Sequence, residues 1–399
     1  MAAYGPWADL HTEVLLTIAA GYSLKDYVHL RSVCTAWRSA LALPPAPPLR
    51  PLLVLADGNR DSASPLLTQH PLHLSTDTSD SGSRVTGPSK ARRRNHIVGS
   101  SDGWLAVASD LMGSCTWTVG ILLVNPHTGE EIKLFPPRSA RYLRKIVFTP
   151  NPRPDDCTAV AISDHREVAY TNHCRDMEWT IIDMALDVTE QLQLQLVDLA
   201  YDAQGGKVYC LDRRGDVRVL RIPRGQMQMP TVEPLLAGNA GLRVNPATVF
   251  APPYDVVSGL TSAKYLFLYD GILYQVWQNI STTVRLPLQD GCRFTMLPDE
   301  IFVLKYDSER NPCWDVVKDL GGCSVFIGMN SPVVVRAEAF PGVRANCVYW
   351  IDWPGVPMVW DMATGTSTPC VLPYGVCRGS CWYFCDDQQV ATMQAAVTT

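Results

Sequence analysis

The chain has little charge and no long apolar run. Charged residues make up 18% of its 399 residues, below the quarter that is usual for soluble domains, which favours a large amount of buried sheet. No stretch approaches the roughly 18 apolar residues of a membrane-spanning helix. The formal net charge of −5 argues against an affinity of the whole chain for nucleic acid or anionic lipid.

Several motifs of secreted, metal-binding and nucleotide-binding proteins are also missing. We see no signal peptide, P-loop, dinucleotide fingerprint or Cys-x-x-Cys pair. The thirteen cysteines follow no framework, so we expect buried thiols in the reducing environment of the nucleus or cytoplasm. His165, His173 and Cys174 lie close in sequence, but zinc requires four ligands. We therefore expect no metal and no cofactor.

Three further motifs have plain structural explanations. Cys377, Cys381 and Cys385 recur every four residues, which in a strand separates neighbours by about 13 Å, too far for one metal. The run Gly99–Gly103 matches the Gly-x-Ser-x-Gly elbow of hydrolases, but that elbow needs a following helix, and the next residues have a strand pattern. The sequon Asn279–Ser281 matters only in a secreted protein. We predict no catalytic residue.

The first 43 residues have a helical pattern that is not seen later. Apolar residues recur at helical intervals from Leu10 to Ala19, where Gly21 ends the helix, and again from Leu24 to Leu43. Such short helices are not stable alone and need the downstream domain or a partner. The pattern itself does not distinguish a cap on the protein's own domain from a docking element. A proline-rich linker, residues 44–51, follows.

Residues 52–399 are predicted to be mainly β. Short runs rich in Val, Ile, Tyr and Trp alternate with turns, as in the hairpin signal Asp270-Gly271 between 264–269 and 272–277. Gln191–Leu199 alternates strictly and predicts a strand. Turn centres lie roughly 35 to 55 residues apart, the interval of four-stranded propeller blades, so we predict a six- or seven-bladed β-propeller. The polar segment 75–95 predicts a long exposed loop.

The N-terminal pattern resembles the F-box motif, a Leu-x-x-Glu helix followed by a Val-Cys-x-x-Trp-Arg run. The resemblance is carried by Leu10, Glu13, Val14, Leu15, Ile18, Leu24, Asp26, Leu30, Val33, Cys34, Trp37 and Arg38. In that family the helices dock a Skp-type adaptor, which links the protein to a cullin–RING ubiquitin ligase. The motif departs from the family at His11, where proline is usual, and at Gly21-Tyr22, which replaces a leucine.

The β-rich part resembles the plant F-box-associated β-propeller family called domain of unknown function 295. The similar segments are Gly99–Val107, Leu122–Pro136, Lys264–Trp277, Asp319–Asp352 and Val359–Pro373. The resemblance implies a small all-α F-box domain, residues 1–43, followed by a propeller, residues 52–399.

Together these features predict a non-enzymatic substrate receptor of an SCF-type ubiquitin ligase. The helices would bind the Skp-type adaptor, and through it the cullin, while the propeller would bind an unknown target protein. The expected adaptor contacts are Leu10, Val14, Leu15, Ile18, Leu30, Val33, Cys34 and Trp37. Two alternatives remain open: an interaction module that has lost adaptor binding, and a propeller enzyme or small-ligand binder whose helices are only a cap.

Overall fold

The computed structural model describes most of the chain. The described residues are 10–20, 30, 33–41, 52–57, 66–71, 94–112, 117–126, 130–137, 143–164, 166–173, 178–186, 193–223, 229–236, 249–261, 263–287, 293–340, 342–352, 355–370 and 381–384. The predicted linker 44–51 and most of the predicted loop 75–95 lie outside them. In these ranges no helix is both long and apolar enough to cross a membrane.

Two short helices form the described part of the N-terminal region. Helix α1 spans Thr12–Ala20 and helix α3 spans Thr35–Ala40. The predicted pattern from Leu24 to Leu43 is not one continuous helix, because Cys34 is in an extended conformation and its sulfur accepts a hydrogen bond from the Trp37 amide. A side-chain acceptor at this position is the usual way to begin a helix.

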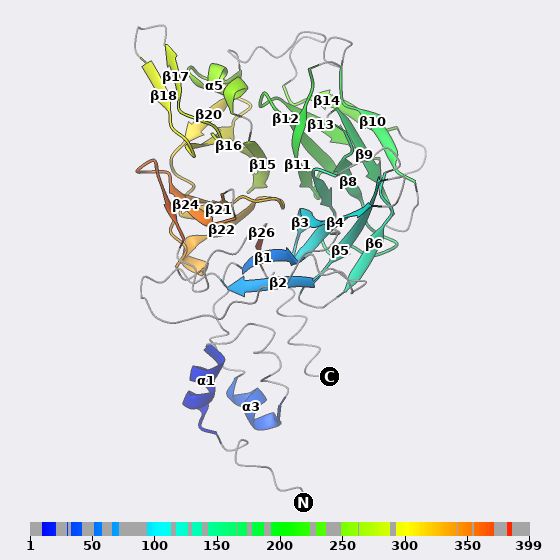
Figure 1. Ribbon diagram of the computed structural model, residues 1–399, viewed down its shortest axis with the longest axis vertical. Helices are drawn as coiled ribbons and strands as arrows, with labels where there is room; N and C mark the ends of the chain where they lie inside the picture. The colour runs from blue at the N-terminus through cyan, green and yellow to red at the C-terminus, as the bar shows by residue number, and fades with distance from the viewer. Residues whose placement is uncertain are drawn as a thin grey trace, which may run out of the picture.

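The rest of the described chain is a β-propeller whose sheets are arranged in a ring (Figure 1). Blades 1, 2 and 3 each have four strands paired antiparallel in chain order. Their strands are β3 (Arg94–Ser101), β4 (Trp104–Met112), β5 (Trp117–Val124) and β6 (Glu131–Leu134); β7 (Ile146–Phe148), β8 (Ala159–Ile162), β9 (Glu167–Thr171) and β10 (Thr180–Asp183); β11 (Leu196–Asp202), β12 (Lys207–Asp212), β13 (Val217–Arg221) and β14 (Thr231–Pro234).

Blades 4 and 5 carry additions to this plan. In blade 4 a hairpin, β17–β18, is inserted between the second and third strands, and helix α5 precedes the first. In blade 5 a fifth strand is present, and β21 pairs with β23 in parallel. The elements are α5 (Tyr254–Leu260), β15 (Ala263–Tyr269), β16 (Ile272–Gln278), β17 (Val284–Pro287), β18 (Arg293–Met296), β19 (Ile301–Tyr306) and β20 (Trp314–Val317); β21 (Cys323–Phe326), β22 (Val333–Arg336), the 3-10 turn Ala337–Ala339, β23 (Cys347–Ile351), β24 (Pro357–Asp361) and β25 (Thr366–Pro369).

A three-stranded sheet, made from the first two strands of the propeller and its last strand, closes the ring. Strand β1 (Leu52–Asp57) pairs with β2 (Leu66–Pro71) on one edge and with β26 (Cys381–Tyr383) on the other. The described residues therefore form five full blades, and the predicted count of six or seven is corrected. Turn spacing counts each sheet of the ring as a blade and cannot reveal that the closing sheet has three described strands, of which β26 lies more than 300 residues from β1 in sequence.

Most predicted strands are confirmed, with shifts at their ends. The Asp270-Gly271 hairpin is present, and both residues have positive φ, 52° and 72°. The predicted strand Gln191–Leu199 begins later, at Leu196, so its alternating glutamines precede β11. The predicted loop 75–95 ends earlier than expected, since β3 starts at Arg94. The core lies between blades, where apolar residues of neighbouring sheets share clusters.

Polar side chains in the middle of the ring join the blades. Lys145 Nζ lies 2.7 Å from Asp198 Oδ1, with both side chains at most 5% exposed. Asp198 Oδ2 accepts the Leu266 amide at 2.7 Å, and Lys145 Nζ donates to the Asn330 carbonyl at 3.0 Å. The Asn330 amide nitrogen donates to Ser100 Oγ at 3.1 Å and to the Trp382 carbonyl at 2.8 Å. Five blades and the closing sheet thus share one network.

We predict that Lys145→Met lowers the free energy of unfolding by about 3–5 kcal/mol, because Asp198 remains as a buried charge without its partner. The double change Lys145→Met with Asp198→Asn should cost less than the single one. Asp315→Asn, which breaks the exposed pair with Arg310, is the control and should cost at most about 1 kcal/mol. Urea unfolding measures all three, and equal losses for Lys145→Met and the control would contradict the network's role.

Candidate functional site

The predicted adaptor-binding residues divide into a buried set and an exposed set. Leu15, Trp37 and Leu41 are buried at 2%, 8% and 1% exposure and form the core of the helical region. Leu10, Leu30, Cys34 and Ala40 pack partly against them. Of these seven residues, Ala40 and Leu41 were not predicted as site residues. They follow Trp37 by three and four residues, so helical spacing places them on the same face as Trp37.

Two of the predicted residues are available for contact. Val14 is 46% exposed and Val33 is 59% exposed, and Ile18 is half-buried. His11 is exposed, and its carbonyl accepts the amides of Val14 and Leu15 at 3.0 and 3.1 Å. His11 therefore stands at the cap position just before α1. The other departure from the motif, Gly21-Tyr22, lies outside the described residues.

A cavity of about 270 Å³ lies where the first strands of blades 1 to 4 meet. Each of β3, β7, β11 and β15 contributes residues from its second half or from the turn that follows it. The lining residues are Ser100, Ser101, Asp102, Val147, Phe148, Pro150, Leu199, Ala200, Tyr201, Ala203, Leu266, Phe267, Leu268, Ser331 and Pro332. Sequence analysis did not predict this cavity, since its walls come from segments more than 40 residues apart.

The hydrolase-like motif forms part of this cavity without the geometry of an elbow. Gly99–Ser101 ends β3, Asp102-Gly103 makes a turn with positive φ at both residues, and β4 begins at Trp104. No helix follows the serines, as the sequence predicted. A Cβ on Gly99 would lie 2.0 Å from the Ile146 carbonyl oxygen, so this glycine allows β3 and β7 to approach each other.

The cysteines and histidines of the described ranges form no metal site. His173 Nδ1 lies 3.2 Å from the Asp155 carbonyl, while His165, Cys174, Cys377 and Cys385 lie outside these ranges. Burial raises the pKa of the Cys347 thiol to about 11 and that of Cys370 to about 12, so both are neutral thiols. The expectation of thiols alone is corrected at Cys157, which is disulfide-bonded, since scattered cysteines do not reveal their pairing.

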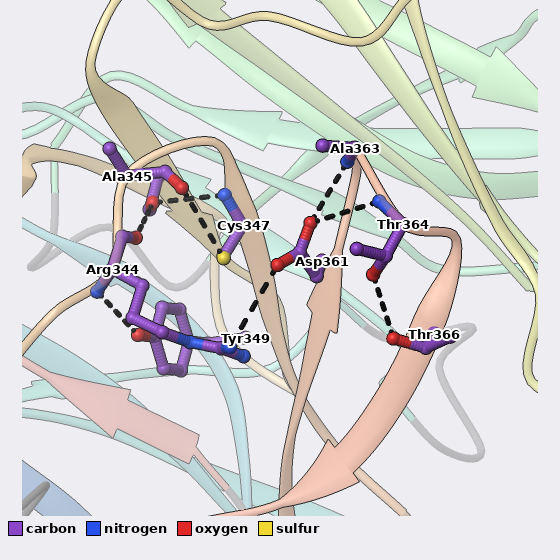
Figure 2. A network of polar contacts seen from close by, with 9 residues as sticks. Arg344, Ala345, Cys347, Tyr349, Asp361, Ala363, Thr364 and Thr366 are labelled. Carbon is purple, nitrogen blue, oxygen red and sulfur yellow. Dashed lines mark hydrogen bonds and ion pairs between the residues drawn. The ribbon is translucent and has the colours of Figure 1, made fainter.

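Blade 5 contains a polar network around Cys347 that stabilises turns (Figure 2). The Cys347 thiol donates to the Ala345 carbonyl at 3.4 Å, and the Arg344 amide donates to Tyr349 Oη at 2.9 Å. Asp361 Oδ1 accepts two amides of the following turn, while its Oδ2 lies 3.8 Å from Arg344 Nη1. These contacts join the turns of blade 5 to one another and to the neighbouring strands.

The sequon is also structural. Asn279 is 1% exposed, and its amide nitrogen donates to the carbonyls of Thr282 and Leu297 at 3.2 and 2.7 Å. A glycan has no access to a nitrogen held in this way.

Lys264 is a buried amine between blades 3 and 4. Its Nζ donates to the Ser258 carbonyl at 2.7 Å and to the carbonyl and hydroxyl of Thr261, and it lies 5.0 Å from the Trp277 ring centre. These two carbonyls lie at the C-terminal end of α5. The last carbonyls of a helix have no hydrogen-bond donors within the helix itself. Burial lowers the pKa of Lys264 to about 7, although the nearby Asp212 carboxylate opposes the shift. Lys264 is therefore a helix cap.

The same contact between blades depends on a glycine. Gly215 has φ 94°, and a Cβ there would lie 3.0 Å from the Trp277 ring. The Gly215 carbonyl accepts a hydrogen bond from the side-chain amide nitrogen of Gln275 at 2.9 Å. Gln275 Oε1 in turn accepts a hydrogen bond from the Trp277 indole nitrogen at 2.7 Å.

We predict that Lys264 makes the stability of the propeller rise with pH between about 7 and 10. The unfolded chain keeps a proton on this lysine up to its ordinary pKa of 10.5, whereas the folded chain loses it near pH 7, so alkaline pH favours folding. At about 1.4 kcal/mol per pKa unit, the change amounts to a few kcal/mol. Urea unfolding of Lys264→Met should lack this rise, while Lys318→Met, at an exposed site, should keep it. An identical pH dependence in both variants would contradict the assignment.

Comparison with known proteins supports the fold. The model of the KIB1-4 beta-propeller family matches residues 73–389, and no curated protein matches the chain. Three solved structures are similar at 12% identity: Sqt1 of Saccharomyces cerevisiae (TM-score 0.30, covering 70% of this chain and 72% of that one), the catalytic domain of the Coprinopsis cinerea GH62 alpha-L-arabinofuranosidase (0.28, 73% and 88%) and a Bacteroides thetaiotaomicron protein of unknown function (0.30, 75% and 69%). TM-scores this low carry no argument. The family match spans most of the chain and agrees with the ring of blades, so the chain belongs to the KIB1-4 beta-propeller family.

Proposed function

We propose that this protein is a substrate receptor of an SCF-type ubiquitin ligase, in which the N-terminal helices bind a Skp-type adaptor and the propeller binds a target. The observation that carries the proposal is the helical pair α1–α3. It has a core of its own, Leu15, Trp37 and Leu41, in which no described residue of the propeller takes part. Its described surface presents two apolar side chains, Val14 and Val33.

A helical pair of this size supports a docking role better than a capping role. A cap would bury its apolar side chains against the propeller, whereas the described core of α1 and α3 is confined to the helical region. A core of three side chains gives little stability by itself, and burying Val14 and Val33 against an adaptor would add to it. The resemblance to the F-box motif names the adaptor class.

In this proposal the propeller supplies no chemical group. A receptor accelerates ubiquitin transfer by holding the target near the conjugating enzyme, which raises the effective concentration of the reacting groups. The neutral thiols of blade 5 and the capped Lys264 are consistent with such a role, because each is occupied in stabilising the fold.

The alternative of a small-ligand binder has one observation in its favour, the central cavity. Its volume of about 270 Å³ is at the lower limit of small-molecule sites, which occupy about 300–1,000 Å³. An isolated interaction module remains the other alternative, and adaptor affinity separates it from the receptor.

We predict that Val14→Asp combined with Val33→Asp weakens binding to a recombinant Skp-type adaptor at least about tenfold, because each change places a charge in an apolar interface. Both side chains are exposed, so the helical pair should still fold. Leu15 and Trp37 are poorer test sites, since changing them disrupts its core as well.

The matched control is Val256→Asp, at a 52% exposed valine on α5 of the propeller, which should leave adaptor binding unchanged. Surface plasmon resonance measures the three affinities, and far-UV circular dichroism checks the helices. No binding by the wild-type chain, or equal binding by the double variant, would contradict the receptor function.

A further inference from the structure

The hairpin β17–β18, which is inserted into blade 4, has one packed face and one exposed face. It forms a separate two-stranded sheet at the periphery of the ring (Figure 1). On the packed face, the ring centre of Phe294 lies 6.3 Å from that of Tyr254 on α5 and 6.3 Å from that of Phe302 on β19. A two-stranded hairpin is marginally stable by itself, so this packing holds it in a fixed orientation on the propeller.

The other face of the hairpin carries two arginines. Alternation along the strands places four exposed residues on the face away from Phe294: Arg285, Pro287, Arg293 and Thr295. The register pairs Arg285 with Thr295, and Arg293 with the proline of β17. The two arginines are therefore diagonal neighbours, about 7–8 Å apart. In the described structure neither guanidinium forms a hydrogen bond or an ion pair.

Two exposed arginines in other parts of the propeller are paired with carboxylates. Arg221 Nη2 lies 2.6 Å from Glu233 Oε1, and Arg310 Nη1 lies 2.7 Å from Asp315 Oδ2. On the hairpin, the residues opposite the two arginines are a threonine and a proline, which carry no charge. Two like charges at this separation repel each other, and an anionic partner would remove the repulsion.

The described carboxylates near the hairpin do not pair with these arginines. Asp299 and Glu300 follow the hairpin, and Glu300 Oε2 accepts the Leu297 amide at 2.7 Å. Asp255 belongs to α5, which lies against the packed face. Residues 280–298 contain two arginines and one carboxylate, Asp290, so the segment has a formal charge of +1 in a chain of −5. Asp290 lies in the connection 288–292, outside the described residues.

Two exposed apolar side chains lie at the base of the hairpin. Ile280 is 61% exposed and Leu297 is 54% exposed. Asn279 joins the two segments, because its side-chain amide donates to the Leu297 carbonyl at 2.7 Å. Leu297 continues the alternation of Arg293 and Thr295, which places it on the same face. Arginine is enriched in protein interfaces, and a face that combines guanidiniums with an apolar side chain suits a protein segment better than a free ion.

We infer that the exposed face of this hairpin, formed by Arg285, Arg293, Thr295 and Leu297, binds an acidic segment of a partner protein. Each guanidinium pairs with a carboxylate, which its planar fork can hold with two hydrogen bonds, and Leu297 contacts an apolar side chain of the segment. This inference names the kind of target for the receptor proposed above and rests on that proposal only for the fate of the partner. Peptide binding needs no adaptor, so either idea can fail without the other.

The test is fluorescence anisotropy at about 0.05 M salt, where exposed charges are screened less than at physiological ionic strength. The first probe is a labelled Gly/Ser peptide that carries glutamates and leucines, and the second is the same peptide with glutamines in place of the glutamates. A labelled oligothymidylate of equal charge is the third. The wild-type protein should bind the glutamate peptide at least about fivefold more tightly than the glutamine peptide, since two exposed charge pairs are formed.

The decisive variant is Arg285→Gln combined with Arg293→Gln, which should remove the preference for glutamate. Both side chains are exposed, so the hairpin should still fold. The matched control is Arg221→Gln combined with Arg310→Gln, which removes the same charge at two exposed ion pairs and should keep affinity within about twofold of the wild type. Leu297→Ser should weaken both peptides alike, by about threefold.

A charge reversal separates loss of the contact from loss of the fold. Arg285→Glu combined with Arg293→Glu should bind a lysine version of the peptide at least about fivefold more tightly than the wild type does, a gain that a misfolded hairpin cannot give. The inference is overturned if the wild type binds the glutamate and glutamine peptides equally or binds neither. It is also overturned if the control loses as much affinity as the decisive variant, or if the oligothymidylate binds more tightly than the glutamate peptide.

Discussion

Closure of the ring is the constraint on which the rest of the structure depends. A propeller blade buries its apolar faces only against the blades beside it, so an open ring would expose two of them. Here β1 supplies the middle strand of the closing sheet and β26 its partner. Asn330 fastens this sheet to its neighbours, because its side chain bonds to Trp382 of β26 and to Ser100 of blade 1. The Lys145–Asp198 pair extends the same network through blades 2 and 3.

Closure also accounts for where polar chemistry is found in this molecule. Lys145, Asp198 and Asn330 lie where side chains of different blades meet, and each is matched by a polar group of another blade. The cavity lies where the first strands of blades 1 to 4 finish. Asp102 and Asp270 are both Asp-Gly turn residues with positive φ, so the backbone geometry of these turns accounts for the aspartates at this end of the propeller.

Local features of this fold were predictable from sequence, and relations between distant segments were not. Alternating runs and the Asp270-Gly271 turn predicted strands close to those observed, because hairpins are determined by neighbouring residues. The partners Lys145 and Asp198 belong to different blades, and neither has a local signal. The predicted blade count was too high because turn spacing cannot show that the last sheet is a three-stranded closing sheet, in which β26 joins β1 from far along the sequence. At the candidate site, helical spacing identified Leu15 and Trp37 but not that they would be buried while Val14 and Val33 face solvent.

The pairing of Leu52 with Tyr383 has a consequence for how the molecule is made. During synthesis β1 emerges early, but its partner strand is translated some 330 residues later, so blades 1 to 5 must wait for the last strand before the ring can close. Contacts between such distant segments form slowly, and until then the edge of β1 is open to pairing with other chains. The edge of β1 is therefore covered only after the polypeptide has been translated through Tyr383.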